Sequence, residues 1–154
     1  MLFLYFFIIY SVLVYIFNNN IKRKKGKYKI MIKDVSQDEL EKIIQEKKIV
    51  ILDCWAPWCG PCKSIAKVLE SKVVPKFEND DDVALIKINI DNNQEFAQGL
   101  QIMSIPTMMF FVDGKRVVFQ GDDGKQEDRI VGFYPNIDEI IINFVEQVRN
   151  PKTE

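Results

Sequence analysis

The amino-acid sequence predicts an α/β fold in which helices flank a central mixed β-sheet, giving three layers. Apolar runs typical of buried strands alternate along the chain with segments whose apolar residues recur at helical spacing. The predicted order, strand–helix–strand–helix–strand followed by a hairpin and a last helix, is typical of a doubly wound sheet. The 154 residues are enough for one domain with a sizeable core.

The N-terminal segment, residues 2–17, contains only apolar residues, tyrosines and Ser11. Its length suits the apolar core of a signal peptide and falls just short of a membrane span, and it lacks the polar face of a surface helix. No basic residue precedes it, no small-residue cleavage site follows it, and the basic run 22–25 favours a cytosolic domain. We expect a signal peptide or membrane anchor over 1–17 and a basic linker over 18–26. We favour the secretory pathway, with a membrane-anchored domain facing the cytosol as the alternative.

The first elements of the domain follow this linker. Alternation over residues 28–33 predicts a strand, and Ser36 with Glu39 forms a capping box that opens a helix with an apolar stripe. Residues 49–55 are a continuous apolar run that predicts a buried strand. A helix is expected directly after Cys59, and Pro75 should kink it or end it near Val74.

The second half of the chain continues the pattern. We expect a turn over residues 79–82, a strand over 83–90, a short helix over 93–100 and a strand over 108–112. Asp113-Gly114 predicts a hairpin turn after which residues 116–119 pair back. Pro135-Asn136 opens the last helix, and residues 150–154 form a frayed tail.

Two cysteines, Cys59 and Cys62, lie where the strand over 49–55 ends and the next helix begins. Free N–H groups and a partial positive charge at a helix N-terminus favour an anion, here the thiolate of Cys59. The thiolate is the attacking species in disulfide exchange, and Cys62 is near enough to resolve the mixed disulfide. The spacing therefore predicts a redox-active dithiol.

Composition excludes several other classes of protein. The chain has no histidine, so catalytic histidines and histidine metal sites are excluded, and three cysteines cannot form the disulfide framework of a small secreted scaffold. We expect no metal site, since only Cys54 and carboxylates remain to supplement the cysteine pair. Residues 27–154 carry 17 basic and 22 acidic side chains, a net charge of −5, so we expect no nucleic-acid binding.

The segment Trp58-Cys59-Gly60-Pro61-Cys62-Lys63, preceded by Asp-x-Trp-Ala-x, resembles the active-site segment of the thioredoxin family. Further resemblances follow in the family's order: residues 87–91 to its third strand, 104–107 to its cis-proline segment, 112–115 to its hairpin turn and 131–132 to its glycine beside the active site. The resemblance covers residues 27–149, which we expect to form a thioredoxin domain with the thioredoxin fold.

This resemblance implies a thiol–disulfide oxidoreductase with no bound cofactor beyond the redox-active disulfide Cys59–Cys62. Cys59 would attack, and Cys62 would resolve with Asp53 as its base. Asp53 interrupts an apolar strand, where desolvation should raise its pKa towards neutral. The matching family lysine suggests Lys87 near Asp53, although Lys87 could instead face solvent. Cys54, on the other face of the strand, is expected to be a structural thiol.

The substrate surface implied by the family is a shallow apolar area around the cysteines. We expect it to comprise Trp58, Gly60, Pro61, Ile90, Ile105, Pro106, Val131 and Gly132. Backbone near Pro106 could pair with an extended substrate segment. Trp55 is expected in the core and Trp58 nearer the surface.

Gly60-Pro61 resembles the reducing members of the family, so we expect this protein to reduce disulfides of other proteins. The expected partners are these substrate proteins and an upstream reductase such as a thioredoxin reductase. We also expect the N-terminal segment to contact a membrane. The alternatives are a disulfide isomerase or oxidase and a non-enzymatic partner-binding subunit of a membrane-associated or secreted assembly.

Between Gly114 and Gly132 the chain has about ten more residues than a typical family member. This acidic insertion, residues 120–128, is a longer solvated turn or a partner-docking loop.

Overall fold

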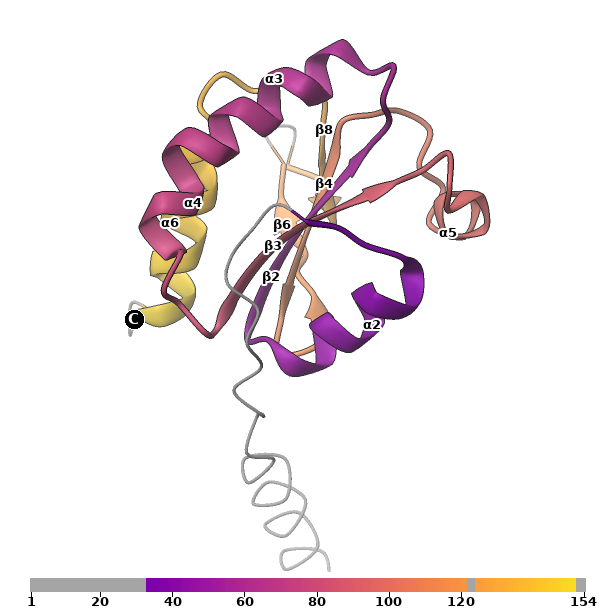
Figure 1. Cartoon of the computed structure of the whole chain (residues 1–154). Coiled ribbons are helices and arrows are strands. Elements are labelled where there is room, and N and C mark those ends of the chain that lie inside the picture. The colour runs from indigo at the N-terminus through magenta and orange to yellow at the C-terminus, as the bar shows by residue number, and fades with distance from the viewer. Residues whose placement is uncertain (1–32, 122–123, 152–154) are drawn as a thin grey trace, which may run out of the picture.

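A computed structural model describes residues 33–121 and 124–151 as a sheet with helices on both faces (Figure 1). The predicted signal or anchor over 1–17, the linker over 18–26 and nearly all of the predicted strand over 28–33 lie outside the described residues. Among the residues described, no helix is both long enough and apolar enough to span a bilayer.

The main sheet is mixed, as predicted. In spatial order its strands are β1 (Lys33–Asp34), β3 (Val83–Asn89), β2 (Ile49–Trp55), β4 (Thr107–Val112) and β5 (Lys115–Arg116), and β8 (Arg129–Val131) also pairs with β4. Strands β1, β3 and β2 are parallel, whereas β4 runs antiparallel to β2, β5 and β8. The two long central strands are buried along almost their whole length, which explains why they read as continuous apolar runs.

Helices cover both faces of this sheet (Figure 1). On one face lie α3 (Gly60–Val68), the π-helical turn η1 (Leu69–Val73), α4 (Val74–Phe77) and α6 (Ile137–Arg149), and α2 (Gln37–Glu46) and α5 (Gln94–Gly99) lie on the other. Alternate residues of β2 divide between the two cores: Ile51 packs with the α3 and α6 side chains, and Leu52 packs with those of α2.

The first helix begins as its sequence predicts. The Ser36 hydroxyl accepts the backbone N–H of Glu39, and the Glu39 carboxylate accepts the backbone N–H of Ser36. Both bonds satisfy N–H groups that have no partner within the helix. The apolar stripe then buries Leu40 and Ile43 against the sheet.

The helix containing Pro75 does not end at Val74, because α4 continues to Phe77. The π-helical turn over Leu69–Val73 precedes the proline, and the N–H of Val74 donates to the carbonyl of Leu69, five residues back. Proline interrupts the ordinary ladder because it has no N–H, and a wider turn before it accommodates the missing bond.

The pairing predicted for residues 116–119 is confirmed for Arg116 and Val117, whose N–H donates to the carbonyl of Phe110 at 2.8 Å, and it is wrong for Phe119. Lys115 and Arg116 pair with β4, but Phe119 belongs to a separate two-stranded sheet of β6 (Phe119–Gln120) and β7 (Gln126–Glu127). Part of the insertion therefore forms a small two-stranded hairpin that is separate from the main sheet. Of its residues, 122 and 123 lie outside the described part of the chain.

Candidate active site

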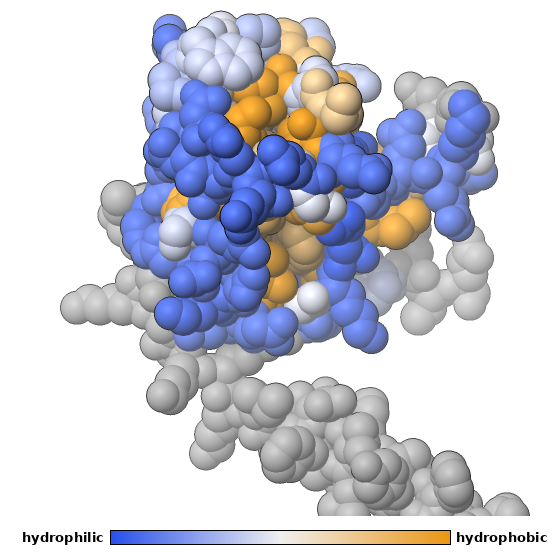
Figure 2. All heavy atoms as spheres, turned by 90° about the vertical axis from the view of Figure 1, so that its right-hand side faces the viewer, coloured by the Kyte–Doolittle hydropathy of each residue, from blue (hydrophilic) through white to orange (hydrophobic). Residues whose placement is uncertain are grey.

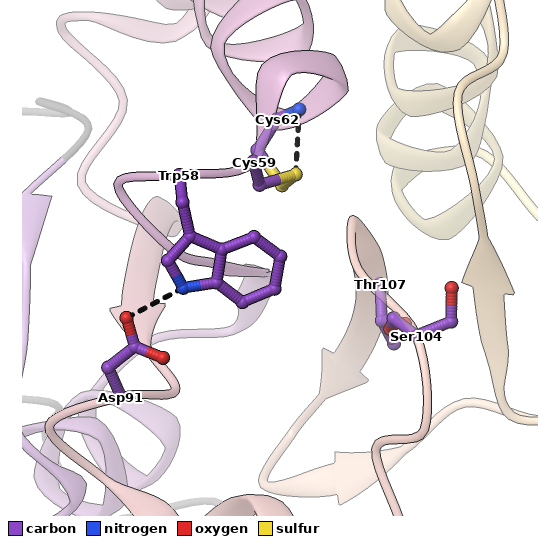
Figure 3. Close-up of a disulfide and its surroundings, with 6 residues drawn as sticks. All are labelled: Trp58, Cys59, Cys62, Asp91, Ser104 and Thr107. Carbon is purple, nitrogen blue, oxygen red and sulfur yellow. Dashed lines mark hydrogen bonds between the residues drawn. A yellow bond between two sulfur atoms is a disulfide. The ribbon is translucent and has the colours of Figure 1, made fainter.

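Cys59 and Cys62 form a disulfide at the point where β2 leads into α3 (Figure 3). Cys59 is the N-cap of α3, and its sulfur accepts the backbone N–H of Cys62 at 3.1 Å. Pro61 occupies the first helical turn, where its missing N–H breaks no helical bond. Cys59 is 4% exposed and Cys62 1%, so both sulfur-bearing side chains are buried in the disulfide form.

The loop before β4 faces this disulfide (Figure 3). The Ile105–Pro106 peptide bond is cis, a state that the sequence left open. The N–H of Gly132 donates to the carbonyl of Pro106 at 2.8 Å, and Val131 lies opposite Thr107 in the register of β8 and β4. These contacts bring Pro106, Val131 and Gly132 together. Gly132 has φ +99°, a backbone conformation that residues with a side chain rarely adopt.

Trp58 forms the other wall of the site and is 68% exposed. Its indole N–H donates to Asp91 Oδ2 at 2.9 Å, and the backbone N–H of Asp91 donates in turn to Asn89 Oδ1 (Figure 3). An exposed ring is thereby held in one orientation beside the cysteines. Sequence reasoning missed Asp91, because the two partners are 33 residues apart and nothing in either segment pairs them.

Apolar surface surrounds the disulfide. Figure 2 shows apolar residues gathered at the top of the molecule, the end at which α3 begins in Figure 1. Of the predicted substrate residues, Gly60, Pro61 and Val131 are exposed, and Ile90 and Ile105 are half-buried. Two further exposed apolar residues lie on the neighbouring loops, where no sequence pattern marks them: Met103 is 93% exposed and Phe133 is 47% exposed.

Asp53 is buried beneath the site, on the face of β2 that α3 covers. It is 1% exposed, and its Oδ1 atom has no hydrogen-bond partner among the described residues. Burial raises the pKa of Asp53 to about 7, against the opposing charge of Lys87. A carboxyl group with this pKa can hold or release a proton near neutral pH.

Lys87 pairs with Asp53 in the register of β2 and β3. Its Nζ lies 4.1 Å from the centre of the Trp55 ring, and the Trp55 N–H donates to Asp34 Oδ1. The lysine is half-buried beside the carboxyl group rather than pointing freely into solvent. The structure thus brings together Asp53, Lys87 and Trp55 on strands β2 and β3.

Cys54 is the free cysteine among the described residues and is fully buried. It packs with Val50 and Leu52 in the core on the α2 side of the sheet. Burial, together with the charge of Asp53, raises the pKa of the Cys54 thiol to about 12, so it remains protonated at neutral pH. The expectation of a structural thiol agrees with this environment. Within 33–121 and 124–151, no cluster of three or more cysteine, histidine or carboxylate side chains could hold a metal ion.

Comparisons of sequence and of structure with known proteins all find the same family. The family model described as Thioredoxin matches residues 31–135. The chain is 35% identical to a thioredoxin of Griffithsia pacifica over 97 residues, which are 63% of this chain and 77% of that protein. It is 38% identical to a thioredoxin of Staphylococcus aureus over 98 residues, 62% of this chain and 82% of the relative. A mutant thioredoxin from Halobacterium salinarum superposes with a TM-score of 0.57 at 27% identity, covering 79% of this chain and 95% of that one.

Proposed function

The chain belongs to the thioredoxin family and is a thiol–disulfide oxidoreductase, and we propose that its Cys59–Cys62 dithiol reduces disulfides of other proteins. The observation that carries this proposal is the position of Cys59, at the N-cap of α3 with its sulfur accepting a helix N–H.

Cys59 attacks the substrate. In the reduced protein the N–H of Cys62, which donates to the Cys59 sulfur, and the partial positive charge at the N-terminus of α3 stabilise the thiolate. The thiolate attacks one sulfur of the substrate disulfide, an S–S bond forms between enzyme and substrate, and the other substrate sulfur leaves as a thiolate. Trp58 and the Pro106 loop on either side of Cys59 hold the substrate segment.

Cys62 resolves the mixed disulfide. Its thiol must lose a proton before it attacks the sulfur of Cys59 and releases the second substrate thiol, and Asp53 accepts that proton. The pKa of about 7 supports this role, since the carboxylate form is available at neutral pH and the protonated form is also accessible. Two electrons pass from the dithiol to the substrate, and the disulfide seen in the structure is the product form. Lys87 beside Asp53 keeps the pKa of the carboxyl group from rising further.

The proposed direction is reduction, because Gly60-Pro61 between the cysteines resembles the reducing members of the family and the chain has no histidine. Continued turnover requires an upstream dithiol donor, such as a thioredoxin reductase. Insulin reduction with dithiothreitol as electron donor is the direct assay, with Cys59→Ser as the comparison. Wild type should accelerate the reduction strongly; equal rates for the two proteins would refute the enzymatic role.

We also propose that the apolar segment 2–17 directs the domain into the secretory pathway. The support is its length and its position ahead of the domain. The basic run over residues 22–25 supports the alternative, an uncleaved anchor with the domain in the cytosol. Alkaline extraction combined with protease protection distinguishes them. A shortened, extractable and protected product supports entry into the lumen, and a membrane-retained domain that protease digests without detergent refutes it.

A further inference from the structure

The insertion builds a groove on the α6 side of the sheet. The hairpin of β6 and β7 stands beside α6, and the space between them has a volume of about 520 Å³. Its floor is apolar, with the ring of Phe110 in edge contact with those of Phe119 and Phe144. Val117, Ile130 and Ile140 complete this floor. We refer to this space as the insertion groove.

Ion pairs hold the base of the β6–β7 hairpin, which forms one wall of the insertion groove. Asp128, which follows β7, accepts hydrogen bonds from Arg116 at 2.6 Å and from Arg129 at 2.7 Å. These two guanidinium groups hold the pKa of Asp128 near 2. Arg129 also donates to the carbonyl of Leu100 at 2.7 Å. The base of the hairpin is thus bonded both to β5 and to the loop after α5, and these bonds fix the position of the hairpin beside α6.

Strand β8 connects the insertion groove to the active site. The side chain of Ile130 lines the groove, and two residues later the N–H of Gly132 bonds to Pro106 beside the disulfide. Two strand residues span about 7 Å. Tyr134, which is 42% exposed, lines the groove from the same segment. A substrate segment bound at Cys59 can therefore reach the groove within a few residues.

The charge of the insertion groove indicates what would occupy it. Among the described residues that line the groove, Glu127 is the one with a charged side chain. A carboxylate above an apolar floor favours an apolar side chain that has a cationic neighbour. We propose that the insertion groove is a second docking site for substrate proteins, which binds an apolar side chain next to a lysine or arginine a few residues from the reactive cysteine.

This inference rests on the proposed function and can be tested separately from it with chromogenic mixed disulfides. The first peptide carries one cysteine joined to thionitrobenzoate, followed after a few residues by Phe-Lys; in the second peptide Ser-Glu replaces Phe-Lys. The Cys59 thiolate attacks the peptide sulfur and thionitrobenzoate leaves. Cys62 then frees the peptide thiol, so the dithiol is oxidised as the mixed disulfide is reduced. Dithiobis(nitrobenzoate), which has no tail, reports the basal reaction.

The full chain should prefer the Phe-Lys peptide by roughly tenfold in kcat/KM, as expected for one desolvated apolar side chain. Two variants should remove this preference by raising KM for the Phe-Lys peptide. Asn143→Trp fills the insertion groove from an exposed position of α6, and Glu127→Lys reverses the charge in its lining. Glu146→Lys is the matched control, because it makes the same change of charge on α6 outside the lining and should keep the preference. All three variants should react with dithiobis(nitrobenzoate) as wild type does.

Several outcomes would overturn the assignment. Wild type that reacts equally with both peptides while reducing dithiobis(nitrobenzoate) refutes the groove alone, whereas failure with all three compounds refutes the proposed function. Equal losses in Glu127→Lys and Glu146→Lys would show a nonspecific effect of charge. A dimer that Asn143→Trp dissociates would assign the groove to a second copy. A preference that rises in Lys24→Glu/Lys25→Glu would assign it to the chain's own N-terminal segment.

Discussion

Replacing Asp53 by asparagine should make the protein more stable at alkaline pH and a poorer enzyme at neutral pH. In the folded protein the carboxyl group is 1% exposed, with one oxygen that has no hydrogen-bond partner among the described residues. The unfolded chain ionises this group at its ordinary pKa of 3.8, but the folded protein ionises it only at about 7. Between these values the folded state holds more protons, so wild-type stability falls as the pH rises through this window.

The size of the effect follows from the two pKa values. A tenfold change in an acid constant is worth about 1.4 kcal/mol, so the buried charge costs on the order of 4 kcal/mol above pH 7 and nothing below pH 4. Asparagine removes this charge but leaves a buried amide that is incompletely bonded, at a cost of about 1–3 kcal/mol. We therefore expect Asp53→Asn to be more stable than wild type by about 1–3 kcal/mol at pH 8, with the advantage lost towards pH 4.

The assay is urea unfolding of the oxidised proteins across this pH range, with Asp81→Asn as the control for the same change at an exposed turn. In parallel, the release of substrate from the mixed disulfide should be slower in Asp53→Asn at pH 7 and should recover at high pH, where Cys62 ionises without assistance. A stability difference that does not depend on pH would refute the buried, destabilised carboxyl group. A release rate with the wild-type pH profile would remove Asp53 from the mechanism.

Two further predictions concern the surface. Asp128→Asn should destabilise the protein by about 1–2 kcal/mol at neutral pH, because Arg116 and Arg129 hold the pKa of Asp128 near 2 and its stabilising charge is present above pH 3.8. The loss should disappear as the pH falls towards 2 in urea unfolding, and equal stability at pH 7 would count against the charge network. Trp58→Ala should raise KM for insulin about tenfold with less than about 0.5 kcal/mol change in stability, because the ring is 68% exposed. An unchanged KM would exclude the ring from substrate binding.

Local sequence patterns were sufficient for most of the fold. The capping box of Ser36 and Glu39 and the apolar run of β2 each specify their structure within a few residues, so they could be predicted without knowing the tertiary contacts. The environment of Asp53 could be predicted for the same reason: a carboxylate inside a continuous apolar strand must be desolvated wherever that strand packs.

Features that depend on distant partners could not be predicted. Strands β6 and β7 have two residues each, too few to show an apolar alternation, and the neighbouring ion pairs of Asp128 join it to Arg116, which is 12 residues away, and to Arg129. The bond between Trp58 and Asp91 joins segments that only the parallel pairing of β2 and β3 brings together. At Pro75 the sequence showed that a helical bond must be lost, but it did not show that a π-helical turn would accommodate the loss.

Trapping of the mixed disulfide tests the division of roles between the two cysteines most directly. Full-length Cys62→Ser, reduced and then incubated with oxidised insulin, should accumulate a covalent adduct that peptide mapping by mass spectrometry locates at Cys59, because the resolving thiol is absent. Cys59→Ser should yield little adduct under the same conditions, since Cys62 is almost fully buried. An adduct that forms in Cys59→Ser and not in Cys62→Ser would reverse the two roles and contradict the mechanism built on the N-cap of α3.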